Sequence, residues 1–505
     1  MFLNSYVGNN RYTSNLVFSI FAWLGVACFA AVLLSVIPGL LYSTSTLGAV
    51  AVGIAFLLTL YAVADSSDRA SLAALLTWFY VLISQEILHP FSDPDEVRRS
   101  GSFDVGSYSE PIIWIFGLMA LAVLTTAKPR YLLSDAFRGQ YRWAIWMTIF
   151  SVVSAVYSPN PSYAFAWSIK LVLVILLLRF YLTELSEIDE LRHFFNVTFW
   201  GYVVLTAVPL FRALMDPSTL FQGAGGRLNA NPSLLSATAG ALCLLGLILH
   251  SLNKRKSSLI GAVFGAVVMV AALGKAGIVS GILSVALFYA LRKRFGAAIA
   301  VTTAMLLVAA VLFVSGGWFA NYIDKYKGAE TLTGRIAIWE KVIPAMLSLR
   351  YLLLGHGYVA SKFVSTEVPG EMVVDHLHNG YLDVTFNNGL LGLLLMVALQ
   401  IGAGRNLWKA LRYSRFLKSP PGRDAGIIAA GTIALLANVL LNGMFNATFG
   451  GRVKAAYMTL LGVAVIAEFL RHKTMAMLGA EVGPTLKVES PQTDFPSQPV
   501  LEPNA

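Results

Sequence analysis

The sequence predicts an all-α polytopic membrane protein with about fourteen transmembrane helices and a large outward loop before the twelfth. Of its 505 residues, 57% are hydrophobic and 13% are charged, and the mean hydropathy is +0.68. Apolar runs near the roughly 20 residues that cross a bilayer recur along the chain. The expected spans are 16–41, 44–64, 71–88, 111–127, 143–158, 163–183, 193–213, 232–251, 257–273, 276–291, 295–316, 386–404, 425–445 and 455–470.

Basic clusters between these spans predict the orientation. Counting spans puts all of them on one side of the membrane, and the positive-inside rule makes that side cytoplasmic, with both termini. The net charge of +10 is therefore a topology signal and does not point to nucleic acid. The clusters lie at 128–142, 254–256, 292–294 and 405–423.

The apolar run from Leu259 to Leu291 is expected to fold as a hairpin. Basic clusters flank it on both sides, and Gly274-Lys275-Ala276-Gly277 interrupts it in the middle. A single crossing would place one basic cluster outside. Lys275 is then at an outward tip, and the same count turns the loops carrying Arg227, Arg335 and His378 outward.

The chain is expected to form one membrane domain, residues 1–470, followed by a polar and disordered cytoplasmic tail, residues 471–505. The first apolar run is too long for a signal-peptide core and should remain as an anchor. Cys28 and Cys243 lie inside apolar runs, so neither a disulfide nor a metal site is expected from them.

The large outward loop, residues 317–385, contains a candidate anion site. Thr333 can cap a short helix from Gly334, which Pro344 limits to about three turns. Arg335 at this helix start suits a phosphate or diphosphate, although it could instead anchor the loop to lipid headgroups. Trp339 follows one turn later, as an interfacial anchor or as a platform for a sugar.

His378 in the same loop is a candidate general base. It lies just before an apolar helix, near the outer membrane boundary, where a neutral imidazole could take a proton from a hydroxyl. Asp375 or Asp383 could hold its tautomer. Two other readings stay open: His376 and His378 could bind a metal, or His378 could be structural.

Three further cations are candidates for substrate binding. Arg227 follows Gly223-Ala224-Gly225-Gly226, a segment that allows close backbone approach but lacks a phosphate-loop pattern. Lys275 at the hairpin tip could equally snorkel to the interface. Lys170 falls within a span, which makes it a functional hypothesis, although it could also reach the surface. Cations and a base on one face suit an anionic group carried by a lipid.

Several motifs resemble the O-antigen ligase and O-antigen polymerase superfamily of bacterial envelope glycosyltransferases. The resemblance covers residues from about Arg227 to Gly392. It rests on Thr333-Gly334-Arg335 with Trp339, Leu354-Gly355-His356-Gly357, His378-Asn379-Gly380-Tyr381-Leu382 and Asn388-Gly389-Leu390-Leu391-Gly392.

The resemblance implies a GT-C-like enzyme of the bacterial inner membrane that works at the periplasmic face without metal or cofactor. The donor would be a polyprenyl-diphosphate-linked glycan and the acceptor a glycan or lipid A-core, with inversion at the anomeric carbon. His378 would be the base, Arg227 and Arg335 would hold the diphosphate, and Asn379 would join the substrate site. The family often has Arg where this chain has Lys275, which keeps the charge but loses the paired geometry.

Four functions remain open at this point. Tyr157-Ser158-Pro159-Asn160-Pro161 and the segment from His378 to Asp383 are more similar to the polymerase branch than to ligases, which favours polymerisation over transfer to lipid A-core. A flippase and a chain-length regulator are candidate partners. A small-anion transporter would place its essential charges near the midplane of the membrane. A non-catalytic scaffold of an export complex is the fourth reading.

Overall fold

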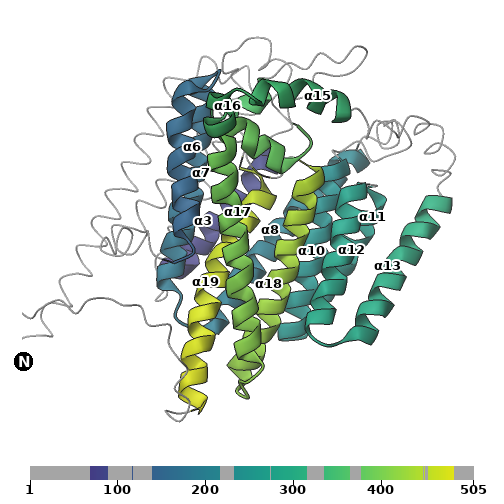
Figure 1. The fold of residues 1–505 in the computed structure, drawn as a ribbon. Coiled ribbons are helices and arrows are strands. Elements are labelled where there is room, and N and C mark those ends of the chain that lie inside the picture. Colours follow the sequence, from purple (N-terminus) through teal and green to yellow (C-terminus); the bar gives the residue numbers. More distant parts are fainter. Residues whose placement is uncertain are drawn as a thin grey trace, which may run out of the picture.

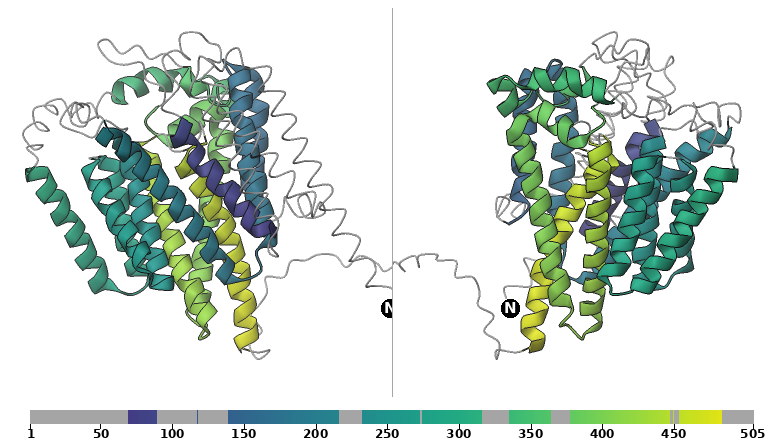
Figure 2. Two further views of the ribbon diagram at one scale, coloured as in Figure 1. Left: turned by 180° about the vertical axis from the view of Figure 1, so that it is seen from behind. Right: turned by 45° about the vertical axis from the view of Figure 1, so that its right-hand side comes forward.

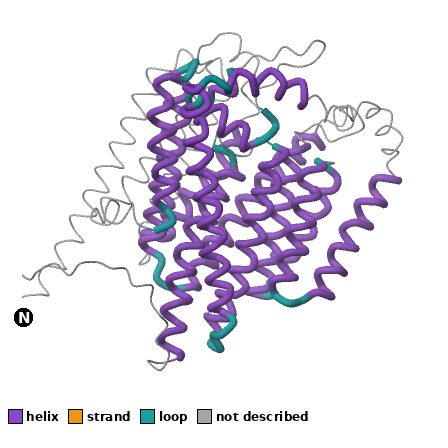
Figure 3. Tube along the Cα trace, viewed as in Figure 1, coloured by secondary structure: helices purple, strands orange, loops and turns teal. Residues whose placement is uncertain are grey.

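The computed structural model describes residues 69–88, 117, 139–215, 232–272, 274–315, 335–363, 377–446, 449 and 453–482. Within these residues every regular element is a helix (Figure 3). The expected spans at 16–41, 44–64 and, apart from Gly117, 111–127 lie outside them.

The helices fall into two series along the chain. The first is α3 (Arg69–Leu88), α6 (Arg142–Ser154) with the 3-10 turn η4 (Ala155–Tyr157), α7 (Pro161–Glu184), α8 (Ile188–Met215), α10 (Pro232–Asn253), α11 (Lys256–Ala271), α12 (Lys275–Leu291) and α13 (Phe295–Ser315). The second is α15 (Arg335–Met346), α16 (Leu349–Leu354), the 3-10 turn η6 (Ala360–Lys362), α17 (Gly380–Ser414), α18 (Pro420–Phe445) and α19 (Ala455–Val482).

Six of these helices are long and apolar enough to cross a membrane, namely α7, α8, α10, α17, α18 and α19. Shorter apolar helices occupy Ala74–Ile83, Arg142–Tyr157, Lys256–Ala271, Lys275–Leu291 and Phe295–Leu307, where spans were also expected. The fold is that of an all-helical polytopic membrane protein, as the composition predicts.

The long helices run side by side, while α15 and α16 lie across one end of the bundle (Figures 1 and 2). α6 and α7 stand on one side, α17 to α19 in the middle, and α10 to α13 on the other side. Large apolar side chains point outward, with exposed fractions of 69% for Ile299 on α13 and 65% for both Leu394 and Ile401 on α17. Such a surface suits contact with hydrocarbon.

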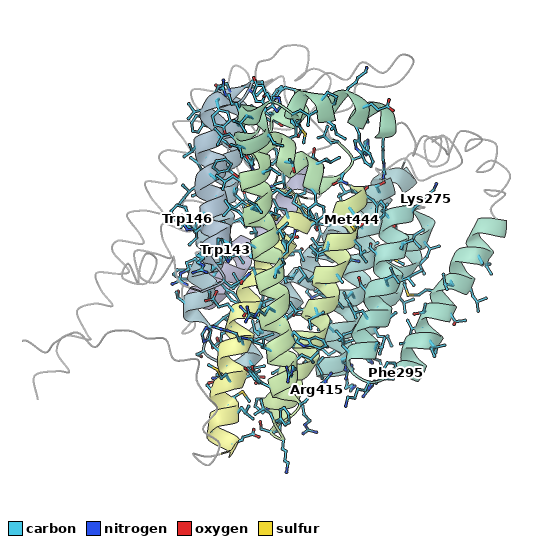
Figure 4. The ribbon with its side chains drawn as sticks, in the orientation of Figure 1. Trp143, Trp146, Lys275, Phe295, Arg415 and Met444 are labelled. Atoms are coloured by element: carbon cyan, nitrogen blue, oxygen red, sulfur yellow. The ribbon has the colours of Figure 1, made fainter. Side chains whose placement is uncertain are left out.

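The predicted hairpin between the basic clusters is confirmed. α11 ends at Ala271 and α12 begins at Lys275, at the end of the bundle where α15 lies, whereas Phe295 and Arg415 lie at the opposite end (Figure 4). The Ser236 hydroxyl of α10 holds the turn because it donates to the carbonyl oxygens of Met269, at 2.9 Å, and Gly274, at 3.1 Å.

The predicted start of a disordered tail at residue 471 is wrong, because α19 continues to Val482. The polar residues there bind the connections between other helices. Lys473 forms an ion pair with Glu187 at 3.0 Å, and the Glu481 carboxylate accepts a bond from the Lys418 amide at 3.0 Å. Thr474 is fully buried and donates to the Leu470 carbonyl, so the helix is still packed at this residue, whereas most residues from Met475 to Glu481 are exposed.

Candidate functional site

A pocket of about 120 Å³ opens among helix ends that meet near α15. It combines the first turns of α10 and α19, the last turns of α18, Tyr202 of α8, and the loop before α17. Met444 of α18 and Lys275 mark this end of the bundle in Figure 4. The lining residues are Tyr202, Ser233, Leu234, Ala237, Thr238, Ala241, His378, Asn438, Val439, Asn442, Asn446, Lys454 and Ala456.

His378 reaches this pocket from a fixed backbone. Its φ is +52°, in the left-handed region that a residue with a Cβ seldom adopts. On the C-terminal side of His378, Asn379 is the N-cap of α17, and its side-chain oxygen accepts bonds from the Tyr381 and Leu382 amides at 2.9 and 3.1 Å. Such a backbone conformation persists only where the surroundings enforce it.

On the N-terminal side of His378, the backbone is held through Leu377, which is 2% exposed. The Leu377 amide donates to the carboxylate of Asp383 at 3.1 Å, and Asp383 is 2% exposed. Asp383 therefore fixes the backbone next to His378, a role that differs from the expected control of the imidazole tautomer. Asp375, the other residue expected to hold the tautomer, lies outside the described residues.

α15 also holds the segment that precedes His378. The indole Nε1 of Trp339 donates to the Leu377 carbonyl at 2.9 Å. The two segments share an apolar cluster, defined by Ile338, Val342, Met346, Ala360, Leu377 and Phe386. Trp339 thus orients the chain before His378, alongside the anchor or platform roles expected for it.

Arg335 is the first residue of α15 and is half-buried. Burial lowers the pKa of its guanidinium, which still remains charged at neutral pH. The helix starts one residue later than expected and passes Pro344, but its 12 residues match the predicted length of about three turns. Arg335 is not among the pocket-lining residues, so the structure places this cation beside the pocket and not within it.

One motif behind the resemblance, Leu354-Gly355-His356-Gly357, binds the two residues directly before another, Asn388-Gly389-Leu390-Leu391-Gly392. α17 is broken at Gly389, where φ is +62°. The break frees the carbonyl oxygens of Phe386 and Asn387, which accept the amides of His356 at 2.8 Å and Gly357 at 2.9 Å. A Cβ at Gly389 would lie 2.2 Å from the Leu353 carbonyl oxygen, so only glycine permits this contact.

Side chains complete this docking. The imidazole of His356 is stacked between the rings of Tyr351 and Phe386, with both centroid distances at 4.1 Å. The Asn387 side chain bonds to the amide and hydroxyl of Ser361, at 2.7 and 3.1 Å. The Ser154 hydroxyl of α6 donates to Asn388 at 3.1 Å. These motif residues build the scaffold beneath α15.

Lys170 does not reach the surface, so that alternative is wrong. Its side chain is 0% exposed in the middle of α7, with the ammonium 5.4 Å from the centroid of the Trp167 ring. On the same face of α7, Lys362 of η6 donates to the Tyr163 hydroxyl at 2.7 Å. Two lysines are therefore buried against aromatic side chains, outside the pocket.

The remaining expected residues are less central. Lys275 is exposed at the start of α12 and does not line the pocket. Arg227, Thr333 and His376 lie outside the described residues. Among the residues that the structure describes, no three His, Cys, Asp or Glu side chains gather as metal ligands would, and Cys243 is buried in α10.

Sequence reasoning missed the polar wall of the pocket. Asn438 and Asn442 lie four residues apart in an otherwise apolar span, and Asn446 follows four residues later, directly after the helix end. Residues four apart share one helix face, and polar side chains inside a membrane span point to function. That spacing was a signal available in the sequence.

Residues 260–397 match the family model of the O-antigen ligase. The matched segment runs from α11 into α17 and contains Lys275, Arg335, Trp339, His378 and Asn379. A comparison with curated proteins gives no match. The residues that carry the resemblance and those that hold the loop before α17 therefore fall in one segment, and this segment is similar to the O-antigen ligase family.

Proposed function

We propose that the chain is a glycosyltransferase that polymerises polyprenyl-diphosphate-linked oligosaccharide repeat units at the periplasmic face of the bacterial inner membrane. The observation that carries this proposal is the setting of His378. It lines a pocket with polar side chains at one end of a membrane bundle, and its backbone is held from both sides by Asn379 and Leu377. A catalytic base needs such a fixed position.

The proposed reaction is one displacement. The acceptor hydroxyl loses its proton to the imidazole of His378, and its oxygen forms a bond to the anomeric carbon of the donor. The bond between that carbon and the diphosphate oxygen breaks, and the diphosphate leaves with the electron pair. Attack from the face opposite the leaving group inverts the anomeric carbon.

Cations beside the pocket would stabilise the departing diphosphate. Arg335 is half-buried at the start of α15, where its guanidinium and the free amides of the first turn can bind phosphate oxygens together. Arg227 and Lys275 are proposed to add charge at the same end of the bundle. Electrostatic stabilisation of this kind could serve in place of a metal ion.

A ligase is the second candidate, because the matched family model is that of the O-antigen ligase. Its donor chemistry would be the same, and the acceptor would be lipid A-core. Both candidates require His378 and Arg335. They differ only in the molecule that enters the acceptor side of the pocket.

Mass spectrometry of polyprenyl-diphosphate-linked glycans tests the proposal in a strain that lacks the chain. Cells carrying His378→Ala should accumulate single repeat units, as the empty strain does. His250→Ala, the same change at the opposite end of α10, should restore the wild-type pool. Long lipid-linked chains that never reach an acceptor would indicate the ligase, and an unchanged glycan pool in the empty strain would favour a transporter.

Arg335 has its own matched comparison. Arg335→Ala should block polymer formation at normal protein abundance, while Arg335→Lys should keep a partial rate because it retains charge without the paired geometry. Arg350 lies on the neighbouring α16 and is exposed, so Arg350→Ala should leave the product unchanged. Wild-type product from Arg335→Ala would remove this residue from the mechanism.

A further inference from the structure

We infer that Asn438 and Asn442 of α18, with its C-cap residue Asn446, form an amide ladder that binds hydroxyl groups of the acceptor sugar and presents one of them to His378. The inference rests on the proposed function and specifies the acceptor side of the same pocket. All three side chains line that pocket together with His378. None of them was expected to belong to the site.

The ladder is built into the helix core. Asn438 is 2% exposed and Asn442 is 1% exposed, and their spacing of four residues places them on one face of α18. An apolar side chain at either position could be buried without leaving a polar group that needs a hydrogen bond. Two amides at these depths therefore require partners, because a buried polar group without a hydrogen bond costs about 1–3 kcal/mol.

The existing bonds fix how the amides point. The Asn442 Nδ2 group donates to the Ser280 hydroxyl of α12 at 2.6 Å and to the carbonyl oxygen of Asn438 at 3.0 Å. It also lies 3.2 Å from Asn438 Oδ1. Since Asn438 offers two acceptors to this group, the nitrogen of Asn442 faces Asn438 and its oxygen faces away.

Three amide atoms are left over within the part of the chain that the structure describes. They are the donors Asn438 Nδ2 and Asn446 Nδ2 and the acceptor Asn442 Oδ1, each buried without a hydrogen-bond partner there. A set of two donors and one acceptor along one wall matches a row of sugar hydroxyls, each of which can donate and accept.

The charge of the wall argues for a sugar and against the diphosphate. Among the lining residues that the structure describes, Lys454 is the only Lys or Arg, and no Asp or Glu is present. A diphosphate needs more cationic charge than that, which Arg335 supplies beside the pocket. The volume of about 120 Å³ leaves room for several polar groups the size of a water molecule. It fits the hydroxyl edge of one terminal sugar.

A transfer assay with the full-length protein tests the ladder. The donor is a lipid-diphosphate-linked repeat unit, and the acceptor is a labelled soluble repeat unit without diphosphate. Asn438→Leu and Asn442→Leu should each raise the acceptor KM by about fivefold, since a hydrogen bond contributes about 1 kcal/mol. The donor KM should not change.

The control is Thr432→Val on the same helix. Thr432 is 0% exposed and its hydroxyl donates to the Ile428 carbonyl at 2.7 Å, so it is a buried polar group of α18 outside the pocket. It should leave the acceptor KM unchanged. Asn438→Leu removes an Nδ2 group that lacks a partner among the described residues and should unfold close to the wild-type temperature. Asn442→Leu also loses the bonds to Ser280 and Asn438 and should unfold at a lower temperature.

An unchanged acceptor KM in both Leu variants would overturn the ladder, and the pocket would then hold water only. A fall in the unfolding temperature with unchanged KM would mean that the amides serve packing. The ladder and the proposed function can fail separately. Full turnover by His378→Ala would show that His378 is not the base, whatever acceptor KM the Leu variants have.

Discussion

The indole of Trp339 donates a 2.9 Å hydrogen bond to the carbonyl oxygen of Leu377, the residue that precedes His378. This bond joins α15, which begins at Arg335, to the segment that carries the proposed base. The proposed diphosphate cation and the proposed base are therefore held in register by one short helix. Trp339 is then a positioning residue whose ring packs on the loop.

Replacing the indole donor should weaken catalysis without unfolding the protein. Trp339→Phe keeps most of the apolar contact and removes the bond to Leu377. A bond of about 1 kcal/mol corresponds to a loss of up to about fivefold in turnover. Trp408→Phe, an exposed tryptophan near the other end of α17, should have no effect. Equal turnover in both variants would show that the bond does not position His378.

Asn379 allows its two roles to be separated, because it caps α17 and was expected to contact substrate. Asn379→Ala should lower the free energy of unfolding by about 1 kcal/mol, the usual loss for an N-cap. Asn379→Ser keeps a capping oxygen and should retain both stability and turnover. Thermal unfolding in detergent and a transfer assay measure the two. A stable Asn379→Ser protein without turnover would instead indicate that Asn379 binds the substrate.

The sequence was sufficient for the hairpin at Gly274-Lys275, because charge on both flanks excludes a single crossing and this reasoning needs no tertiary contact. The scaffold role of Gly355-His356-Gly357 could not be predicted in the same way. These residues bond to Phe386 and Asn387 about thirty positions away, and nothing local in the sequence reveals such a pairing. The sequence shows this motif, but it does not show which residues the motif contacts.

The beginning of α17 shows a second limit. The apolar run predicts a span from residue 386, whereas the helix starts at Gly380 with the polar Asn379 as its cap. Hydropathy locates the part of a helix that faces hydrocarbon, and the first turns of α17 are covered by protein. Asp383 and Asn387 are 2% and 0% exposed there. The hydropathy pattern therefore places the start of the helix too late, because its first turns contain polar residues that are buried against α15 and η6.

Gly389 should be the most sensitive glycine of α17. Gly389→Ala places a Cβ about 2.2 Å from the Leu353 carbonyl at a φ of +62°, so the docking of His356 and Gly357 must open. We expect a loss of at least about 2 kcal/mol in stability and loss of turnover. Gly404→Ala on the same helix meets only Leu436, at 3.7 Å, and should be neutral or stabilising. Similar unfolding temperatures for the two variants would contradict the docking.

The stacked His356 should make the protein less stable as the pH falls. Burial lowers the pKa of His356 below its ordinary value of 6.5, although the imidazole Nδ1 lies 3.3 Å from the Phe386 carbonyl. The folded imidazole therefore stays neutral in a range where the unfolded one takes up a proton. Its contribution to stability is complete above pH 6.5 and is lost progressively below that value.

His356→Phe tests this dependence, because phenylalanine can stack between Tyr351 and Phe386 without titrating. Unfolding temperatures measured between pH 8 and pH 5 should fall for the wild type below about pH 6.5, and the curve of His356→Phe should be flatter. A competing effect has the opposite sign, since two aromatic faces at 4.1 Å also attract an imidazolium. If that attraction exceeded the cost of burial, the wild type would gain stability relative to His356→Phe on acidification.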